Sequence, residues 1–304
     1  MKSGLEKEQQ HSNRTNLKIG AMWSNFRDRM SLIHNRLNEI RPTYGGKALL
    51  IGAGNGYDLP LSQLEANYES IVVVDIDTDS FKELLKQVSC PEKFKFVHVD
   101  VSGVGSQIPS LRKLTELEII QMIDKLEYRD EWTNKLEGSF DFIMTCHLTT
   151  QLVSPFFMME MLAMKGNISW EYNMAVNRLS ERVINGLFQS ISTILSKEGL
   201  FFHSTDTFEL SYNESTDTWR KGSEEILKAA NFNIDFLHEV PSLVYTDLIS
   251  KGYHITGSTL PDTLFETYEK LPYNYISPWQ FSNEGSFLKT YVVFSYPFIL
   301  KAES

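Results

Sequence analysis

Apolar residues along this chain gather either in short continuous runs or in stripes at helical spacing. Runs that read as strands lie at residues 48–51, 69–75, 94–99, 140–145 and 200–206. Their continuity is typical of strands buried on both faces of a parallel sheet. Stripes of apolar residues between these runs predict intervening helices. With a closing strand at 288–298, the pattern predicts an α/β fold built on a doubly wound, seven-stranded, mostly parallel sheet.

Both ends of the chain carry additions to this pattern. Residues 1–16 are polar and are expected to form a disordered or loosely attached tail. Residues 19–40 have helical apolar spacing and stop before Pro42. We therefore divide the chain into an N-terminal tail and helix at 1–43 and a main domain at 44–304. An aromatic-rich stretch with weak periodicity at about 241–287 is interpreted as a late insertion.

A glycine-rich loop follows the first predicted strand. Gly52, Gly54 and Gly56 alternate with other residues in the stretch LLIGAGNG. Glycine permits positive φ angles and close approach of the backbone to a ligand. Tyr57 stands where the dinucleotide fingerprint G-x-G-x-x-G/A needs a small residue, and no P-loop motif is present. The loop therefore favours a nucleotide-like ligand that has no pyrophosphate.

Acidic residues close the second and third predicted strands. Asp75 ends the run ESIVVVD, and Asp100 follows the third strand in VDVS. An acid at the end of the second strand can accept hydrogen bonds from both hydroxyls of a ribose. A helix N-cap or turn role is the alternative for Asp100, as it is for Asp77 and Asp79.

Together, LLIGAGNG, VVVDID and VDVS resemble the motifs of class I S-adenosylmethionine-dependent methyltransferases. The resemblance covers roughly residues 44–208, and the turn LSKEGLFF before the fifth strand also resembles this family. It implies a Rossmann-like fold, S-adenosylmethionine as cofactor and methyl transfer as the activity. It also implies cofactor contacts for Gly52, Gly54, Asn55, Gly56, Asp75, Ile76, Asp100, Val101, Thr145 and Cys146.

Residues after the fourth strand are candidates for the acceptor side of the site. His147 follows this strand, where an acceptor would approach, and is the candidate general base. A polar residue satisfied by a backbone carbonyl is the alternative role. Gln151 could orient an acceptor, and the aromatic residues Tyr275 and Trp279 could line an apolar pocket. A helix-surface role for Gln151 and a core role for the two aromatic residues stay open.

Net charge and cysteine content limit the classes of ligand and partner that this protein is expected to bind. The formal net charge is -10 and the sequence pI is about 5.3, which disfavours a nucleic-acid substrate. The two cysteines, Cys90 and Cys146, are far apart and support neither a disulfide framework nor a zinc site. No apolar run is long enough to span a bilayer. We expect a cytoplasmic protein acting on a small or medium organic acceptor, and the sequence does not specify its oligomeric state.

Three other functions are compatible with parts of the pattern. A protein that binds S-adenosylmethionine without catalysis would carry the same motifs. Aminopropyl transfer from decarboxylated S-adenosylmethionine would need further acids beside the glycine loop, where Asp58 and Asp77 stand. An NAD-dependent oxidoreductase is disfavoured by Tyr57.

Overall fold

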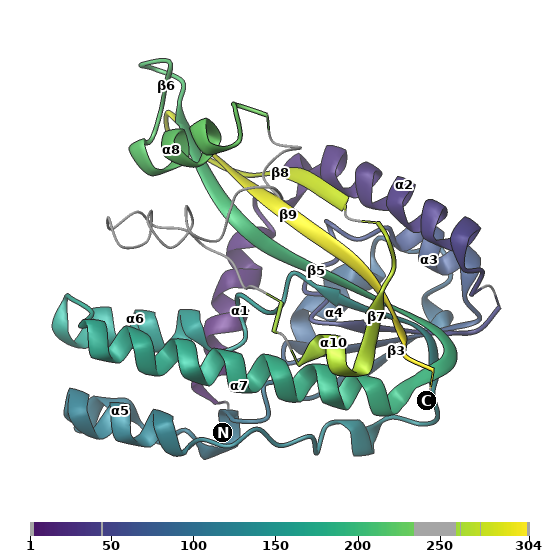
Figure 1. The fold of residues 1–304 in the computed structure, drawn as a ribbon, viewed down its shortest axis with the longest axis horizontal. Helices are drawn as coiled ribbons and strands as arrows, with labels where there is room; N and C mark the ends of the chain where they lie inside the picture. Colours follow the sequence, from purple (N-terminus) through teal and green to yellow (C-terminus); the bar gives the residue numbers. More distant parts are fainter. Residues whose placement is uncertain (1–2, 44, 234–259, 262, 274, 303–304) are drawn as a thin grey trace.

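The computed structural model describes residues 3–43, 45–233, 260–261, 263–273 and 275–302. One mixed sheet runs through the described chain, in the order β3-β2-β1-β4-β5-β9-β7 (Figure 1). Two further strands lie off this path, β6 beside β5 and β8 beside β9. The strands are β1 (Lys47–Ile51), β2 (Ser70–Asp75), β3 (Phe94–His98), β4 (Phe140–Cys146), β5 (Leu195–Asn213), β6 (Thr218–Trp219), β7 (Tyr268–Lys270), β8 (Tyr275–Glu284) and β9 (Phe287–Leu300).

The strand pairing confirms the predicted doubly wound, mostly parallel sheet. The first five strands of the path pair in parallel, whereas β9 runs antiparallel to β5. Strand order reverses at β1, which pairs with β2 on one side and with β4 on the other. In open α/β sheets, ligands bind at the carboxyl ends of the strands beside this point of reversal.

Helices cover both faces of the sheet (Figure 1). One apolar cluster joins the sheet to α7 and its neighbours, and a second joins it to α2, α3 and α4. The α-helices are α1 (Gly4–Asn16), α2 (Ser24–Ile40), α3 (Leu61–Asn67), α4 (Thr78–Leu85), α5 (Glu116–Lys125), α6 (Ser154–Lys165), α7 (Trp170–Ile194), α8 (Lys221–Ala229) and α10 (Leu264–Thr267). Short 3-10 turns are η1 (Gly20–Trp23), η2 (Pro91–Lys93), η3 (Gly105–Gln107), η4 (Leu111–Lys113) and η5 (Thr133–Lys135).

The expectation of a disordered or loosely attached tail over residues 1–16 is wrong, because α1 occupies most of this segment. The Ser3 hydroxyl caps the helix by accepting a hydrogen bond from the Glu6 amide. Leu5 and Asn13 are buried against the rest of the protein. Glu, Gln and Lys are good helix formers, but the segment lacks a continuous apolar stripe. Contacts with distant parts of the chain hold α1 in place, and the local pattern did not reveal them.

The last third of the chain contributes strands to the sheet. Both β7 and β8 pair with β9, so the described part of the aromatic-rich stretch at 241–287 is largely sheet. Residues 241–259 of this stretch lie outside the described residues. The division into domains and an insertion remains a prediction.

Strand β5 is much longer than the predicted strand at 200–206. It pairs with β9 from Phe201↔Phe298 to Asn213↔Phe287, beyond the region where β4 accompanies it. The long antiparallel partner supplies the hydrogen bonds that extend the strand. Among the described residues, no helix is both long enough and apolar enough to cross a membrane.

Candidate functional site

The glycine loop turns the chain from β1 toward α3. All three alternate glycines have positive φ angles, 72° at Gly52, 51° at Gly54 and 74° at Gly56. A Cβ atom on Gly52 would lie 2.7 Å from the Leu148 Cδ1 atom. Both the backbone conformation and the close approach of Leu148 therefore require glycine at position 52.

Asp75 closes β2 beside this loop. Its Oδ2 atom accepts a hydrogen bond from the Gly54 amide at 2.9 Å, and its Oδ1 atom accepts one from the Asp77 amide at 2.9 Å. Burial raises the pKa of the Asp75 carboxyl to about 6, and the two backbone hydrogen bonds act in the opposite direction. Each carboxylate oxygen keeps a second lone pair that can accept a ligand hydroxyl.

Asp100 follows β3 and is held in a similar way. Its Oδ1 atom accepts a hydrogen bond from the Ser102 amide, and its Oδ2 atom accepts one from the Gly105 amide, both at 2.9 Å. Asp100 also lines the neighbouring cleft. An N-cap or turn role for this residue is therefore compatible with a role in ligand binding.

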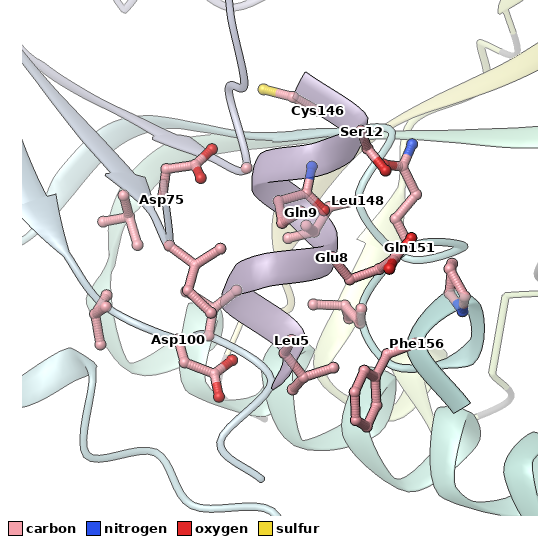
Figure 2. Close-up of a pocket in the computed structure, with 17 residues that line it drawn as sticks. Leu5, Glu8, Gln9, Ser12, Asp75, Asp100, Cys146, Leu148, Gln151 and Phe156 are labelled. Atoms are coloured by element: carbon pink, nitrogen blue, oxygen red, sulfur yellow. The ribbon is translucent and has the colours of Figure 1, made fainter. Parts of the chain in front are cut away.

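A cleft with an empty volume of about 710 Å³, its open mouth included, lies at the carboxyl ends of the parallel strands (Figure 2). Of the predicted site residues, seven line the cleft: Gly52, Asp75, Ile76, Asp100, Val101, Cys146 and Gln151. Because these residues come from separate segments, the fold brings the main predicted cofactor motifs to one cavity.

Other predicted site residues do not line the cleft. They are Gly54, Asn55, Gly56, Thr145, His147, Tyr275 and Trp279. Gly54 acts through its amide on Asp75, as described above. The Thr145 hydroxyl hydrogen bonds with His203 Nδ1 at 2.7 Å. The Asn55 side chain donates to the Asn13 carbonyl at 2.7 Å, so Asn55 joins the glycine loop to α1.

Helix α1 forms one wall of the cleft, and the sequence interpretation missed this wall entirely. Leu5, Glu8, Gln9 and Ser12 face the cavity from this helix (Figure 2). No motif marks these residues in the sequence. The only local signals are the capping serine and the helix-forming composition of the segment.

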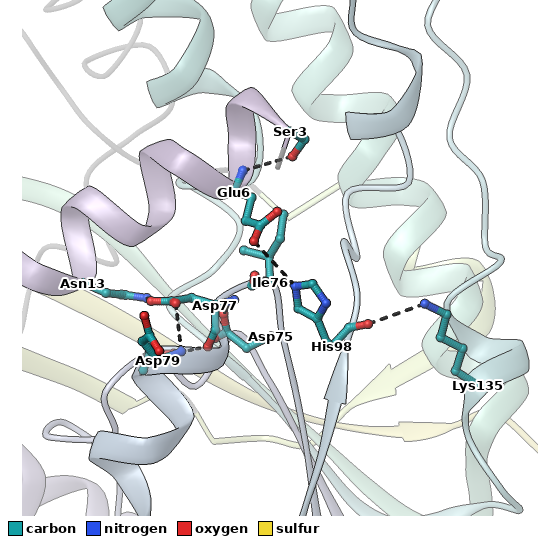
Figure 3. Close-up of polar contacts among 10 residues, drawn as sticks. Ser3, Glu6, Asn13, Asp75, Ile76, Asp77, Asp79, His98 and Lys135 are labelled. Carbon is teal, nitrogen blue, oxygen red and sulfur yellow. Dashed lines mark hydrogen bonds and ion pairs between the residues drawn. The ribbon is translucent and has the colours of Figure 1, made fainter. Parts of the chain in front are cut away.

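Asn13 fastens α1 to the strand-end loops. Its side-chain amide donates to Asp77 Oδ2 at 2.9 Å (Figure 3), and its carbonyl accepts the hydrogen bond from Asn55. Asp77 in turn caps α4 by accepting from the Asp79 amide. Nearer the start of α1, Glu6 Oε1 lies 3.9 Å from His98 Nε2. These contacts hold α1 across the site.

His147 belongs to a buried cluster behind the cleft wall. The ring lies between two carboxyl groups, with Nε2 at 3.6 Å from Asp58 Oδ2 and Nδ1 at 3.5 Å from Asp206 Oδ1. Within the described part of the chain, neither ring nitrogen has a hydrogen-bond partner, and neither does Asp206 Oδ1. Phe26 and Trp279 pack against the ring with centroid distances of 5.4 and 5.0 Å. The neighbours of His147 in sequence, Cys146 and Leu148, line the cleft, whereas His147 does not.

Burial favours the neutral forms of all three groups in this cluster. It lowers the pKa of His147 to about 3 and raises the pKa of Asp58 to about 7. It also raises the pKa of Asp206 to about 8, with a further contribution from the Asp58 charge. The nitrogen–oxygen distances exceed 3.4 Å and the pKa shifts favour the neutral forms of all three groups. The contacts of His147 with Asp58 and Asp206 are therefore contacts between neutral groups rather than ion pairs. His147 also has a φ of 53°, which is uncommon outside glycine.

Tyr275 and Trp279 lie on β8, away from the cleft. Trp279 is 4% exposed and packs against the rings of Trp23 and Phe26, each at a centroid distance of 4.9 Å. Tyr275 is half-buried and contacts the Phe202 ring. The substrate role predicted for these two residues is not supported by a cavity beside them among the described residues, and it stays a prediction.

The described residues include no group of three or more His, Cys, Asp or Glu side chains that could hold a metal ion. Cys90 and Cys146 are both free thiols. Burial raises the pKa of the Cys146 thiol well above its usual value, so this residue contributes a neutral, apolar surface to the cleft.

Comparison with known proteins finds matches among solved structures. No protein-family model matches the chain, and no curated protein matches it. Many solved structures do, among them S-adenosylmethionine-dependent methyltransferases.

Three solved structures illustrate this similarity. The N-methyltransferase NodS from Bradyrhizobium japonicum WM9 is 9% identical, with 92% of this chain and 98% of that chain covered and a TM-score of 0.40. A S-adenosylmethionine-dependent methyltransferase from Clostridium acetobutylicum ATCC 824 is 11% identical, covering 92% and 91%, with a TM-score of 0.42. The YcgJ protein from Bacillus subtilis is 10% identical, covering 91% and 100%, with a TM-score of 0.43. At these identities and TM-scores the likenesses carry no argument about function, which is argued from the site.

Proposed function

We propose that this protein binds S-adenosylmethionine in the cleft and transfers its methyl group to a small or medium organic acceptor. The observation that carries the proposal is the convergence of Gly52, Asp75 and Asp100 on one cavity at the carboxyl ends of β1, β2 and β3. These residues come from three separate motifs, and each has the chemistry that one part of an adenosyl sulfonium needs.

The residues present fit this cofactor. Gly52 lines the cleft with backbone atoms alone, so the amino-acid part of the ligand can lie against its main chain. Asp75 has lone pairs to accept the ribose hydroxyls, and Asp100 can accept the exocyclic amine of adenine. Ile76, Val101 and Leu148 add apolar surface on which a flat base can lie.

Methyl transfer mainly requires the protein to align the methyl donor with the acceptor. The bound cofactor supplies an activated methyl group on a positively charged sulfur. The chain's own residues hold donor and acceptor in line and exclude water, with α1 closing one side of the cleft. A proton acceptor is needed only when the acceptor loses a proton in the reaction.

The first experiment tests cofactor binding by titration calorimetry with S-adenosylhomocysteine. We expect Asp75→Ala to weaken binding by about 1–3 kcal/mol, the usual cost of leaving buried polar partners unsatisfied. Asp79→Ala is the matched control, because Asp79 is an exposed acid in the first turn of the neighbouring α4. Thermal melting of each variant separates lost affinity from lost folding. Equal affinity of wild type and Asp75→Ala would remove Asp75 from the site.

A second experiment distinguishes catalysis from binding alone. The protein is incubated with methyl-labelled S-adenosylmethionine and a metabolite extract, and label is sought in the small-molecule fraction. Transfer of label supports the methyltransferase. Tight binding without transfer would favour a non-catalytic binding protein, and tighter binding of decarboxylated S-adenosylmethionine would favour aminopropyl transfer.

A further inference from the structure

The cleft is lined by acids without any basic counterpart. Glu8, Asp75 and Asp100 contribute carboxyl groups to its wall, whereas no Lys, Arg or His side chain is among its described lining residues. The whole chain carries a formal net charge of -10. Such a surface attracts cations and repels anions. It therefore favours a cofactor and an acceptor that are positively charged or neutral.

The three carboxyl groups differ in how they are held. Asp75 and Asp100 each accept two backbone hydrogen bonds, and the proposed function uses them for the nucleoside. Glu8 makes no hydrogen bond or ion pair within the described part of the chain. It stands on α1 and points toward the side of the cleft where Gln151 lies, across from Asp75 and Asp100 (Figure 2). This carboxyl group is therefore available to a second ligand.

Around Glu8 the cleft wall is mainly apolar. Leu5 and Phe156 lie on this side, and Gln151 adds one amide (Figure 2). Leu152 and Pro155, neighbours of these residues in the chain, also line the cleft. A carboxylate in apolar surroundings binds a cationic hydrogen-bond donor better than a neutral one, since charge-assisted hydrogen bonds are stronger. The apolar residues suit a hydrocarbon body attached to that cation.

We propose that the acceptor is an amine with a small apolar body, and that Glu8 binds its ammonium group. This inference rests on the proposed function. The ammonium first gives one proton to the Glu8 carboxylate or to water. The freed nitrogen lone pair then forms a bond to the methyl carbon while the carbon–sulfur bond breaks, and its electron pair stays on sulfur. The products are the methylated ammonium and neutral S-adenosylhomocysteine.

The test uses the full chain saturated with S-adenosylhomocysteine. Calorimetry compares 2-phenylethylamine and hexylamine with their alcohol analogues, 2-phenylethanol and 1-hexanol. We expect both amines to bind about tenfold or more tightly than their alcohols, the factor that one charge-assisted hydrogen bond supplies. Glu8→Gln should abolish most of this preference. Asp124→Asn is the charge-matched control, because Asp124 is half-exposed on α5 and pairs with Arg178.

The outcomes separate the two proposals. Tight S-adenosylhomocysteine binding with no preference for amines would overturn the amine inference and leave the proposed function intact. A preference that survives in Glu8→Gln would overturn the role of Glu8. Absence of S-adenosylhomocysteine binding would overturn both proposals. As a second measurement, label from S-adenosylmethionine should appear in 2-phenylethylamine and not in 2-phenylethanol, and Glu8→Gln should lower that transfer at least about tenfold.

Discussion

Two pairs of acids at the same end of the sheet are held in opposite ways, and all of them except the half-buried Asp100 are buried. Asp75 and Asp100 line the cleft, and backbone amides donate to every one of their carboxylate oxygens. Asp58 and Asp206 lie behind the cleft wall and face the two nitrogens of the buried His147 ring, which makes no hydrogen bond to the residues that the structure describes. Backbone hydrogen bonds therefore hold the first pair, whereas the second pair faces a buried ring across distances too long for hydrogen bonds.

The pKa values express this difference. Burial raises the pKa of Asp75 only to about 6, because the Gly54 and Asp77 amides stabilise the charged form. Burial raises the pKa of Asp206 to about 8, where one side-chain hydrogen bond from Thr150 opposes it. Backbone N–H groups at a strand end lower the pKa of a buried carboxyl and so favour its charged form, which binds polar ligands, whereas burial raises the pKa. Substitutions in the buried cluster and in the α1 contacts test this comparison.

The largest effect is expected for His147→Ala. The ring packs between Phe26 and Trp279 and is 2% exposed, so its loss should destabilise the fold by about 2–5 kcal/mol, as for other large buried side chains. Because His147 does not line the cleft, affinity of the folded protein for S-adenosylhomocysteine should hold. Denaturant unfolding and calorimetry measure the two quantities.

A different outcome would give His147 the role of general base. In that case His147→Ala, or the more conservative His147→Asn, would lower methyl transfer about a hundredfold or more while stability and cofactor affinity stayed near wild type. Asparagine tolerates the positive φ angle at this position better than alanine, so the pair of variants also separates backbone strain from side-chain chemistry.

An intermediate effect is expected for Asp206→Asn, and it depends on pH. The folded protein holds the Asp206 proton up to a pKa of about 8, far above the usual value of 3.8. Wild-type stability from this group is thus present at low pH and is lost as pH rises toward 8. Asparagine does not titrate, so the variant should gain stability relative to wild type by more than about 1 kcal/mol between pH 5 and pH 8.5.

Denaturant unfolding at several pH values measures this difference. Asp124→Asn, which removes a half-exposed carboxylate, is the control for net charge. If the difference between Asp206→Asn and wild type stays constant across this range, the Asp206 carboxyl is already charged in the fold and the contrast with Asp75 is lost.

The smallest effect is expected for Asn13→Ala, which removes the hydrogen bond from α1 to Asp77. Losing one hydrogen bond of this kind should weaken S-adenosylhomocysteine binding about two- to tenfold, because α1 covers the cleft less firmly. Limited proteolysis should cut the first residues faster. His11→Ala is the control on the exposed face of the same helix, and equal behaviour of the two variants would show that α1 does not shape the site.

Much of the fold followed from local patterns. The apolar runs at 48–51, 69–75 and 140–145 correspond to β1, β2 and β4, since strands buried on both faces must be continuously apolar. The boundaries of β5 were too short, because an antiparallel partner far along the chain extends it. Asp75 and Asp100 could be identified together with the strands, because each of them directly follows or ends an apolar run in the sequence.

The sequence by itself determined the parallel core strands, the glycine loop and the two acids that face the cleft, because these depend on residues that are neighbours in the chain. Tertiary structure alone decided that α1 walls the cleft and that His147 lies between Asp58 and Asp206. Those arrangements depend on contacts between distant segments, such as Asn13 with Asp77 and β4 with β5. A polar helix and a lone histidine carry no local pattern that records where they dock.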